Sequence, residues 1–330
     1  MPEQESCVSG SIKLGMPKIK KSAPISKYPL SSTQTGIFFL SQMNHSGLAL
    51  ELCYQLILRG IPDDAALEKA LYALEERHPV LKTRFVLDEG KAWQYIVSNQ
   101  KLNISYYNFL HLTSIERDSK LKQIIQTELE QSFQIFDSPL VHYCLIRYAA
   151  DRTIILLKVH HLITDGFSFE ILHRHFAEFY NQYHKGGTLI SSDESTYSDY
   201  VCWENELTDT KYYQESKSFW EKTVKPKCDP LELASDFPRP YPRQYTGSIF
   251  EQQLDQTSKK QLIHLGIQRS VSLATVLLTA LAIVLYKHSG QNDFYIGVVV
   301  NGRSNLPQLR NIVGVFSKNF APYALPLTLI

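Results

Sequence analysis

The sequence predicts a mixed α/β protein, in the α+β sense, in which helices cover mixed β-sheets. Segments with the periodicity of helices and of strands alternate irregularly, without an internal repeat, which favours mixed layers over a helical bundle or a β-sandwich. The 330 residues are 44% hydrophobic and 20% charged. Such a chain buries a substantial core, in two lobes or in one large one.

The first residues lack the pattern of a packed element. Residues 1–24 contain prolines, glycines and a basic cluster of Lys18, Lys20 and Lys21, which together predict a flexible leader. We interpret the cluster as a solvated tail, with a docking site for another subunit as the alternative.

Four helices and five strands are expected before residue 185. The helices are residues 34–42, capped by Ser31 or Ser32; 64–74, capped by Asp63 or Asp64; 115–133; and 167–183. The side chains expected to face inward in the first two are Ile37, Phe38, Leu40, Leu67, Ala70, Leu71 and Leu74. The strands are residues 52–58, 83–87, 93–97, 141–148 and 153–159, of which the second and third form a hairpin across residues 88–90.

The second half of the chain begins with a polar segment. Residues 184–215 are predicted to form a loop-rich crossing between lobes. Pro238, Pro240 and Pro242 exclude regular structure over residues 236–242. A second series is then expected: a strand from Ser248, a helix at 258–268, a buried helix at 273–288 and a strand at 293–300. The 14 apolar-rich residues 273–286 fall short of the roughly 20 that span a bilayer, so no membrane association is predicted.

Charge and cysteine content exclude several classes of protein. The 34 basic and 33 acidic residues leave no electrostatic footprint for nucleic acid. The five cysteines are scattered, without a Cys-x-x-Cys pair, which excludes a disulfide framework and a zinc ribbon and favours a reducing compartment. The polar N-terminus is not a signal peptide, so a cytoplasmic location is expected.

The strongest chemical signal is a pair of histidines at the end of an apolar strand. Residues 153–159 are almost continuously apolar, as in a strand covered on both faces, and lead into His160 and His161. We expect one imidazole to face a cavity and the other to fix the turn. Asp165 needs an arginine partner beside a buried strand, and Gly166 permits a positive φ or close approach of another backbone.

A metal site at these histidines is not expected. Adjacent residues on a strand point to opposite faces, so His160 and His161 are poorly placed to share one ion. A zinc site needs at least three protein ligands, and no nearby cluster of His, Cys or carboxylate residues supplies them.

The segment His160-His161-Leu162-Ile163-Thr164-Asp165-Gly166 resembles the signature of the condensation-domain superfamily of nonribosomal peptide synthetases, which includes chloramphenicol acetyltransferase-like enzymes. Four further segments resemble other family motifs in the same order. They are residues 30–40, 77–85, 197–203, and 296–303 with 313–316. Gly36, Lys82 and residues 317–319 depart from the usual family residues.

The resemblance implies a two-lobed, V-shaped chloramphenicol acetyltransferase-like fold with a central tunnel. The expected divisions are an N-terminal lobe at 25–185, an inter-lobe crossing at 186–215 and a C-terminal lobe at 216–330. Because family members continue well past the fifth motif, the second lobe is expected to be incomplete.

The resemblance also implies an activity, in which a carrier-bound aminoacyl amine attacks a carrier-bound acyl or aminoacyl thioester to form an amide, as in antibiotic biosynthesis. Both substrates would be carried on 4′-phosphopantetheine by donor and acceptor peptidyl carrier proteins, beside synthetase domains such as adenylation, with no cofactor bound directly. The open alternatives are an epimerisation domain, a free-standing acyl-CoA-type acyltransferase and a catalytically silent carrier-docking module.

Within that activity, His161 is the expected catalytic residue. It would act as general base or, as we favour, position the amine and stabilise the oxyanion, because an α-amino group with a pKa of roughly 8 is already partly neutral. The Gly166 N–H would assist at the oxyanion. His160 and Asp165 would be structural, the latter paired with Arg303, or otherwise with Arg77 or Arg84.

Overall fold

The structure is a computed structural model that describes residues 18–21, 26–42, 50–188, 194–224, 229–238, 240–241, 247–303, 306–319 and 323–324. Most of the predicted leader lies outside these residues. Within its described part, Ile19 is only 6% exposed and belongs to the main hydrophobic core. The prediction of an unpacked leader is therefore wrong at this position, where one apolar side chain between three lysines is buried.

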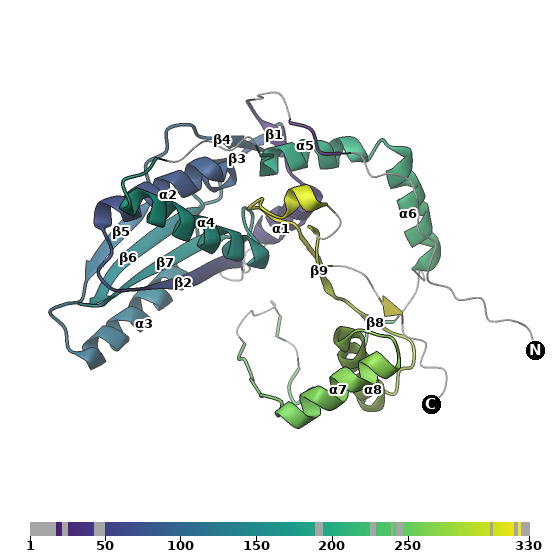
Figure 1. The fold of residues 1–330 in the computed structure, drawn as a ribbon. Coiled ribbons are helices and arrows are strands. Elements are labelled where there is room, and N and C mark those ends of the chain that lie inside the picture. The colour runs from purple at the N-terminus through teal and green to yellow at the C-terminus, as the bar shows by residue number, and fades with distance from the viewer. Residues whose placement is uncertain are drawn as a thin grey trace, which may run out of the picture.

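A four-stranded sheet forms the centre of the N-terminal half. Its strands are β2 (Glu51–Arg59), β5 (Ile104–Asn108), β6 (Val141–Ala149) and β7 (Arg152–His160), in the order β2-β7-β6-β5. The β5–β6 pair is parallel and the others are antiparallel. Helices α2 (Asp64–Arg77) and α4 (Gly166–His184) cover one face and α3 (Ser114–Glu130) covers the other (Figure 1). Both faces of β7 are thus buried, as its apolar sequence predicts.

Helix α2 begins at one of its expected caps, and α3 begins at a cap that the sequence analysis did not name. Asp63 accepts hydrogen bonds from the N–H groups of Ala65 and Ala66 at the start of α2, and a capping box of Thr113 and Glu116 starts α3. In α1 (Ser32–Gln42) the buried residues are Gln34 and Phe38, whereas Leu40 is 47% exposed. The inward position predicted for Leu40 is wrong, because it lies two residues, about 200°, beyond Phe38 around the helix.

A second, smaller sheet contains the predicted hairpin. Strands β3 (Thr83–Asp88) and β4 (Lys91–Ile96) pair across Glu89 and Gly90, and β1 (Tyr28–Pro29) adds to β4. The 3-10 turn Pro79–Lys82 connects α2 to β3.

The segment predicted to be a loop-rich crossing, residues 184–215, contains helical residues, so its predicted loop-rich character is wrong, while its place between two lobes stays a prediction. Helices α5 (Tyr197–Leu207) and α6 (Lys211–Thr223) occupy it. Thr196 and Asp199 form a capping box at α5, and Thr210 caps α6. These local start signals, together with the burial of the α5 aromatic residues, determine the structure despite the polar composition.

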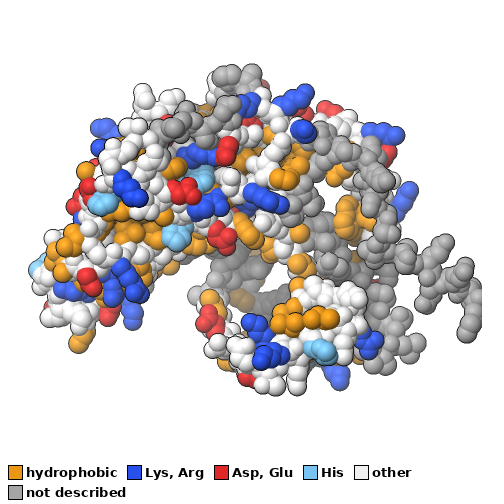
Figure 2. All heavy atoms as spheres, in the orientation of Figure 1, with side chains coloured by type: hydrophobic (Ala, Val, Ile, Leu, Met, Phe, Trp, Pro, Cys, Tyr) orange, Lys and Arg blue, Asp and Glu red, His pale blue; other side chains and the backbone are white. Residues whose placement is uncertain are grey.

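The C-terminal half differs most from expectation. Helices α7 (Gln256–Gln268) and α8 (Leu273–Ser289) form as predicted, but Ala282 is the one buried residue of α8, and Leu277, Leu281 and Val284 are 45–52% exposed. Hydrophobic side chains accordingly show on the surface of this region (Figure 2). Among the described residues, α8 is covered mainly by α7. The apolar side chains on the rest of its surface therefore stay exposed, and the prediction of a buried helix is wrong.

The strands predicted in this half are also revised. No strand forms at Ser248, where Ile249 and Phe250 are each 88% exposed. The strand predicted at 293–300 is two short ones, β8 (Tyr295–Ile296) and β9 (Val299–Asn301), which pair with β11 (Tyr323–Ala324) and β10 (Ser317–Asn319). The 3-10 turn Pro307–Leu309 lies between β9 and β10.

By length and composition, no single helix of the described residues qualifies as a membrane span. Helices α7 and α8 qualify only when taken together, and they are bent by 102° at the break between them.

Candidate active site

The histidine motif forms a tight turn between the buried strand β7 and helix α4. The His160 N–H donates to the Leu140 carbonyl at 3.0 Å, and the His161 N–H donates to the Leu50 carbonyl at 2.8 Å. The end of β7 is therefore held from both sides. A rigid strand end of this kind fixes the direction of the side chains that leave it.

The side chain of His161 is partly exposed and its tautomer is determined by one contact. Its Nδ1 lies 2.8 Å from the Thr164 carbonyl oxygen. Because a carbonyl only accepts hydrogen bonds, Nδ1 carries the proton and donates it. The lone pair of Nε2 is therefore available to a partner outside the turn.

His160 lies on the other side of the turn and is 2% exposed. Its Nδ1 accepts the Leu162 N–H at 3.0 Å. Burial lowers the pKa of His160 to about 3, with a smaller effect from His161, so the ring is neutral near pH 7. This geometry is that of a structural residue, the role expected for His160.

Asp165 is fully buried, and hydrogen bonds surround both of its carboxylate oxygens. Oδ1 accepts the Ser168 N–H at 3.0 Å and caps α4, while Oδ2 accepts from Arg303 Nη1 at 2.7 Å. Oδ2 also accepts the N–H groups of Phe316 and Ser317 at 2.9 and 3.1 Å. Burial alone raises the pKa of Asp165, but the Arg303 guanidinium and these hydrogen bonds lower it below its ordinary value.

Arg303 is equally enclosed, at 3% exposure. Its Nη2 donates to the carbonyls of Ile312 and Gly314 at 3.2 and 3.1 Å, and its guanidinium lies 4.2 Å from the centre of the Phe316 ring. The pair thus connects the start of α4 to residues 303–317. The partner predicted for Asp165 is confirmed.

The two alternative partners of Asp165 lie elsewhere, so neither contributes to this site. Arg77 pairs with Glu194, and Arg84 binds the side chain of Gln100 at 2.5 Å. Arg77 ends α2 and Arg84 lies on β3 of the second sheet, so their positions in the fold keep both guanidinium groups from the motif.

Gly166 was expected to adopt a positive φ or to allow close approach of another backbone, and both expectations are wrong. Its φ is not in the left-handed region, and a Cβ at this position would have no atom within 4 Å. The residue is exposed and is the first of α4. Its N–H therefore has no acceptor within the helix and lies at the positive end of the helix dipole.

Close approach occurs instead at a glycine that the sequence analysis did not single out. A Cβ on Gly314 would lie 2.1 Å from the Tyr197 ring. The Tyr197 hydroxyl in turn donates to the Val315 carbonyl at 3.0 Å and lies 3.0 Å from Ser31 Oγ. The sequence signal for this contact was the Val-Gly-Val-Phe run at 313–316, since an isolated glycine in an apolar, strand-like run marks a close approach of another group.

Gln34 is a second residue whose role was missed. It is fully buried, and its Nε2 donates to the Leu162 carbonyl inside the histidine turn at 3.0 Å. Its side chain also bonds Gln94. The two amides support the turn from α1 and β4, and a glutamine at an inward position of a helix was the available signal.

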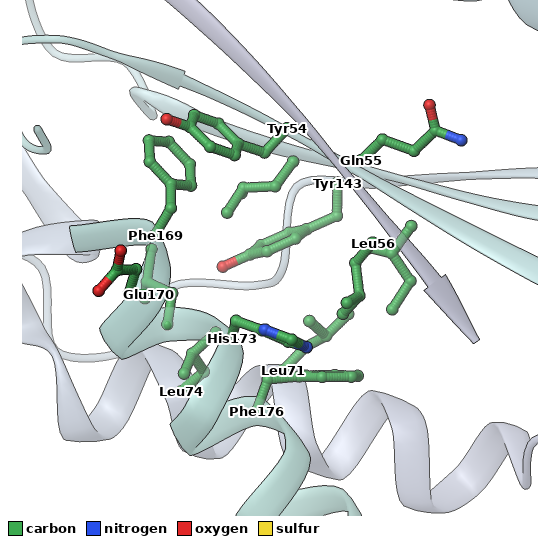
Figure 3. Close-up of a pocket in the computed structure, with 13 residues that line it drawn as sticks. Tyr54, Gln55, Leu56, Leu71, Leu74, Tyr143, Phe169, Glu170, His173 and Phe176 are labelled. Carbon is green, nitrogen blue, oxygen red and sulfur yellow. The ribbon is translucent and has the colours of Figure 1, made fainter. Parts of the chain in front are cut away.

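Two cavities lie near this motif. One, of about 300 Å³, lies between the sheet and helices α2 and α4, and its lining is mostly apolar (Figure 3). Its lining residues are Tyr54, Gln55, Leu56, Leu71, Leu74, Tyr143, Ile155, Leu157, Phe169, Glu170, Leu172, His173 and Phe176. The other, of about 250 Å³, is lined by Phe167, Glu170, Ile171, Arg174, Asn301, Arg303 and Arg310. A continuous central tunnel stays a prediction.

Comparison with known proteins agrees with the motif resemblance. The condensation-domain family model matches residues 25–323. Gramicidin S synthase 2 of Aneurinibacillus migulanus is 28% identical over 309 residues, which are 94% of this chain and 7% of that protein. Tyrocidine synthase 3 of Brevibacillus parabrevis is 29% identical over 294 residues, which are 89% of this chain and 4% of that protein. The chain thus spans a small part of these relatives.

Solved structures show the same fold. The X-domain from teicoplanin biosynthesis has a TM-score of 0.84 at 22% identity, with 94% of this chain and 68% of that one covered. The starter condensation domain of the rhizomide synthetase, solved with C8-CoA and Leu-SNAC, has a TM-score of 0.74 at 18% identity, with 91% and 66% covered. The chloramphenicol acetyltransferase-like fold expected from the sequence is confirmed.

Proposed function

The chain belongs to the condensation-domain family, and from this membership we propose that His161 promotes amide formation between a thioester donor and an acceptor amine. The observation that carries the proposal is the state of the His161 ring. Its Nδ1–H is committed to the Thr164 carbonyl, so Nε2 presents a lone pair from a rigid strand end on a partly exposed side chain. Such a group accepts a hydrogen bond from an amine and orients it.

The reaction proceeds in two steps. The amine nitrogen attacks the thioester carbonyl carbon to give a tetrahedral intermediate, and His161 Nε2 accepts the hydrogen bond of the attacking N–H. The C–S bond then breaks, the proton passes to the departing sulfur, and the amide forms. The exposed Gly166 N–H, at the start of α4, stabilises the negative oxygen of the intermediate.

Asp165 does not take part as a base in this scheme. Both of its oxygens accept hydrogen bonds from buried groups, and its charge is paired with Arg303. An epimerisation reaction needs a second acid or base beside the histidine, and Asp165 does not supply it. Its role is to hold the turn that presents His161.

The partners in this proposal are a donor and an acceptor carrier protein, each with 4′-phosphopantetheine, and neighbouring domains such as adenylation. Support comes from the relatives, which are large peptide synthases of which this chain matches a small share. The chain itself binds no cofactor in this scheme, because the pantetheine arm arrives with each carrier.

The test uses the 330-residue chain with aminoacyl-loaded donor and acceptor carriers, followed by intact mass. We expect an amide product on the acceptor carrier. His161→Ala should lower the rate by roughly 10²–10⁴-fold without changing the unfolding midpoint. The control is His264→Ala, an exposed histidine on α7, which should leave the rate unchanged.

Other outcomes overturn the proposal in favour of a specific alternative. Inversion of the donor without condensation indicates an epimerisation domain, and transfer only from a soluble thioester indicates a free-standing acyltransferase. Carrier binding without turnover indicates a docking module. A His161→Ala variant of normal rate removes His161 from the mechanism.

The apolar cavity between the sheet and α4 supports a further proposal about the donor. Phe169, in the first turn of α4, stacks on Tyr54 and lines the cavity three residues after Gly166. A volume of about 300 Å³ is at the lower end of ligand pockets and accepts a short acyl chain or one apolar side chain. We propose that the apolar part of the donor occupies it.

A further inference from the structure

Three side chains with metal-binding atoms meet on the face of the central sheet opposite α2 and α4. They are Glu128 on α3 and His142 and Cys144 on β6, and their ligand atoms all lie within 4.8 Å of one another. His142 Nδ1 is 2.9 Å from Glu128 Oε2, Cys144 Sγ is 3.4 Å from Glu128 Oε1, and Cys144 Sγ is 3.9 Å from His142 Nδ1. This group lies apart from the histidine motif.

These separations match the edges of a zinc coordination sphere. With Zn–N and Zn–O bonds of about 2.0–2.2 Å and a Zn–S bond of about 2.3 Å, tetrahedral ligand atoms are about 3.3–3.6 Å apart. Each of the three observed distances is within about 0.5 Å of that range, with the two carboxylate oxygens of Glu128 facing one partner each. A cation therefore fits among the three side chains with small side-chain movements.

The surroundings also fit a ligand set. The Nε2 atom of His142 lies 3.0 Å from Ser105 Oγ, a contact that orients the ring and directs Nδ1 toward the other two residues. Glu128 and Cys144 are 6% and 1% exposed, whereas His142 is partly exposed. The more open side, at His142, leaves room for a water as fourth ligand.

We propose that Glu128, His142 and Cys144 bind a borderline-soft divalent cation of the zinc class. A thiolate, an imidazole and a carboxylate together favour Zn²⁺ over the oxygen-preferring Mg²⁺ and Ca²⁺. The thiolate and the carboxylate neutralise the two charges of the ion. The bound ion links α3 to the central strand β6 and stabilises that contact.

Lys158 is the nearby positive charge that opposes cation binding. It lies on β7 directly opposite His142 in the strand register. Its ammonium, however, bonds the Gln131 carbonyl and lies 4.6 Å from the centre of the Phe133 ring. Its ammonium is thus hydrogen-bonded beyond the end of α3 rather than to the three ligand side chains.

The test is titration of the full chain with Co²⁺ under reducing conditions, since Co²⁺ occupies zinc sites and reports a thiolate ligand by its charge-transfer absorption. We expect one equivalent to bind with that absorption, to be displaced by Zn²⁺ and to be unaffected by excess Mg²⁺. Absence of the absorption in the wild-type chain overturns the proposal and leaves the group as a buried hydrogen-bonded cluster.

Variants locate the ion. Cys144→Ser should abolish the charge-transfer absorption, and His142→Gln should weaken Co²⁺ binding on the order of tenfold or more. The control is Cys202→Ser, a partly buried cysteine on α5 that lies outside the cluster, which should keep the absorption. If the absorption survives in Cys144→Ser or disappears in Cys202→Ser, the site is elsewhere. A rise of the wild-type melting temperature with Zn²⁺ but not Mg²⁺ is expected independently of the variants, and its absence also contradicts the proposal.

Discussion

Replacing Arg303 by alanine is the most informative perturbation of the motif, because it removes one partner of a fully buried ion pair. The carboxylate of Asp165 is 0% exposed and would lose the guanidinium that lies 2.7 Å away. The carbonyls of Ile312 and Gly314 would lose a donor at the same time. All of these groups would remain enclosed.

The expected loss of stability follows from this enclosure. Breaking a buried ion pair by removing one partner costs about 3–5 kcal/mol, because the remaining charge is desolvated without compensation. The Phe316 and Ser317 N–H groups still bind the carboxylate and keep the cost toward the lower value. We therefore expect Arg303→Ala to lower the free energy of unfolding by about 3 kcal/mol.

Urea unfolding followed by circular dichroism measures the change, and a double-mutant cycle assigns it. The variant Arg303→Met with Asp165→Asn should be less destabilised than the sum of the two single changes, because the charges are removed together. A loss below about 1 kcal/mol in Arg303→Ala, or simple additivity in the cycle, would refute the reasoning.

The pH dependence gives a second check on the same pair. The pKa of Asp165 is lowered in the folded state, so its stabilisation is fully present above the ordinary value of 3.8 and is lost as the pH falls through the folded value. In Arg303→Ala, burial is left to raise the pKa of Asp165. The difference in unfolding free energy between wild type and variant should therefore narrow as the pH falls from 7 through that raised value and on through the wild-type value.

Three further outcomes are expected. Gly314→Ala should lower the free energy of unfolding by about 3 kcal/mol, because its Cβ would meet a buried ring at 2.1 Å. Gly36→Ala, on an exposed face of α1 with no atom within 4 Å, should raise it by about 0.5–1 kcal/mol. Equal urea midpoints for the two variants would contradict this. Burial lowers the pKa of His78 well below 6.5 and that of His160 to about 3. The free energy of unfolding should therefore decrease as the pH falls below 6.5, by up to about 1.4 kcal/mol per pH unit for each group. A flat profile between pH 7 and pH 5 would show that the two rings are not buried in the neutral form. Leu157→Phe, which fills part of the apolar cavity, should slow condensation of donors with a short acyl chain or an apolar side chain more than of acetyl donors. An equal effect on both would place the donor elsewhere.

Local sequence signals predicted the histidine turn and most of the N-terminal half. The apolar run of β7, the histidines that follow it and the aspartate that caps α4 are neighbours in the chain, and their geometry depends mainly on strand periodicity and helix capping. The same holds for the hairpin β3–β4 and for α2. The polar segment 184–215 shows the limit of composition, because caps and buried aromatic residues made it helical.

Burial in the C-terminal half depended on neighbours that the local pattern does not specify. The hydrophobic sequence of α8 predicts a helix and predicts that its surface prefers to be covered, but it does not determine which element covers it. The exposed fractions of Leu277, Leu281 and Val284 follow from the tertiary arrangement alone. The strand expected at Ser248 failed for the same reason, since a strand requires a partner.

By itself, the sequence predicted the fold class and the family, and it led to the proposal that His161 meets the substrate, because the histidine motif consists of residues close together in the chain. Only the tertiary structure decided that Arg303, rather than Arg77 or Arg84, neutralises Asp165 from 138 residues away, and that Gln34 and Gly314 support the histidine turn. It alone also brought Glu128, His142 and Cys144 together. The reason is that contacts between distant residues depend on how the sheets and helices pack, and charge or hydrophobicity alone does not select one partner among several.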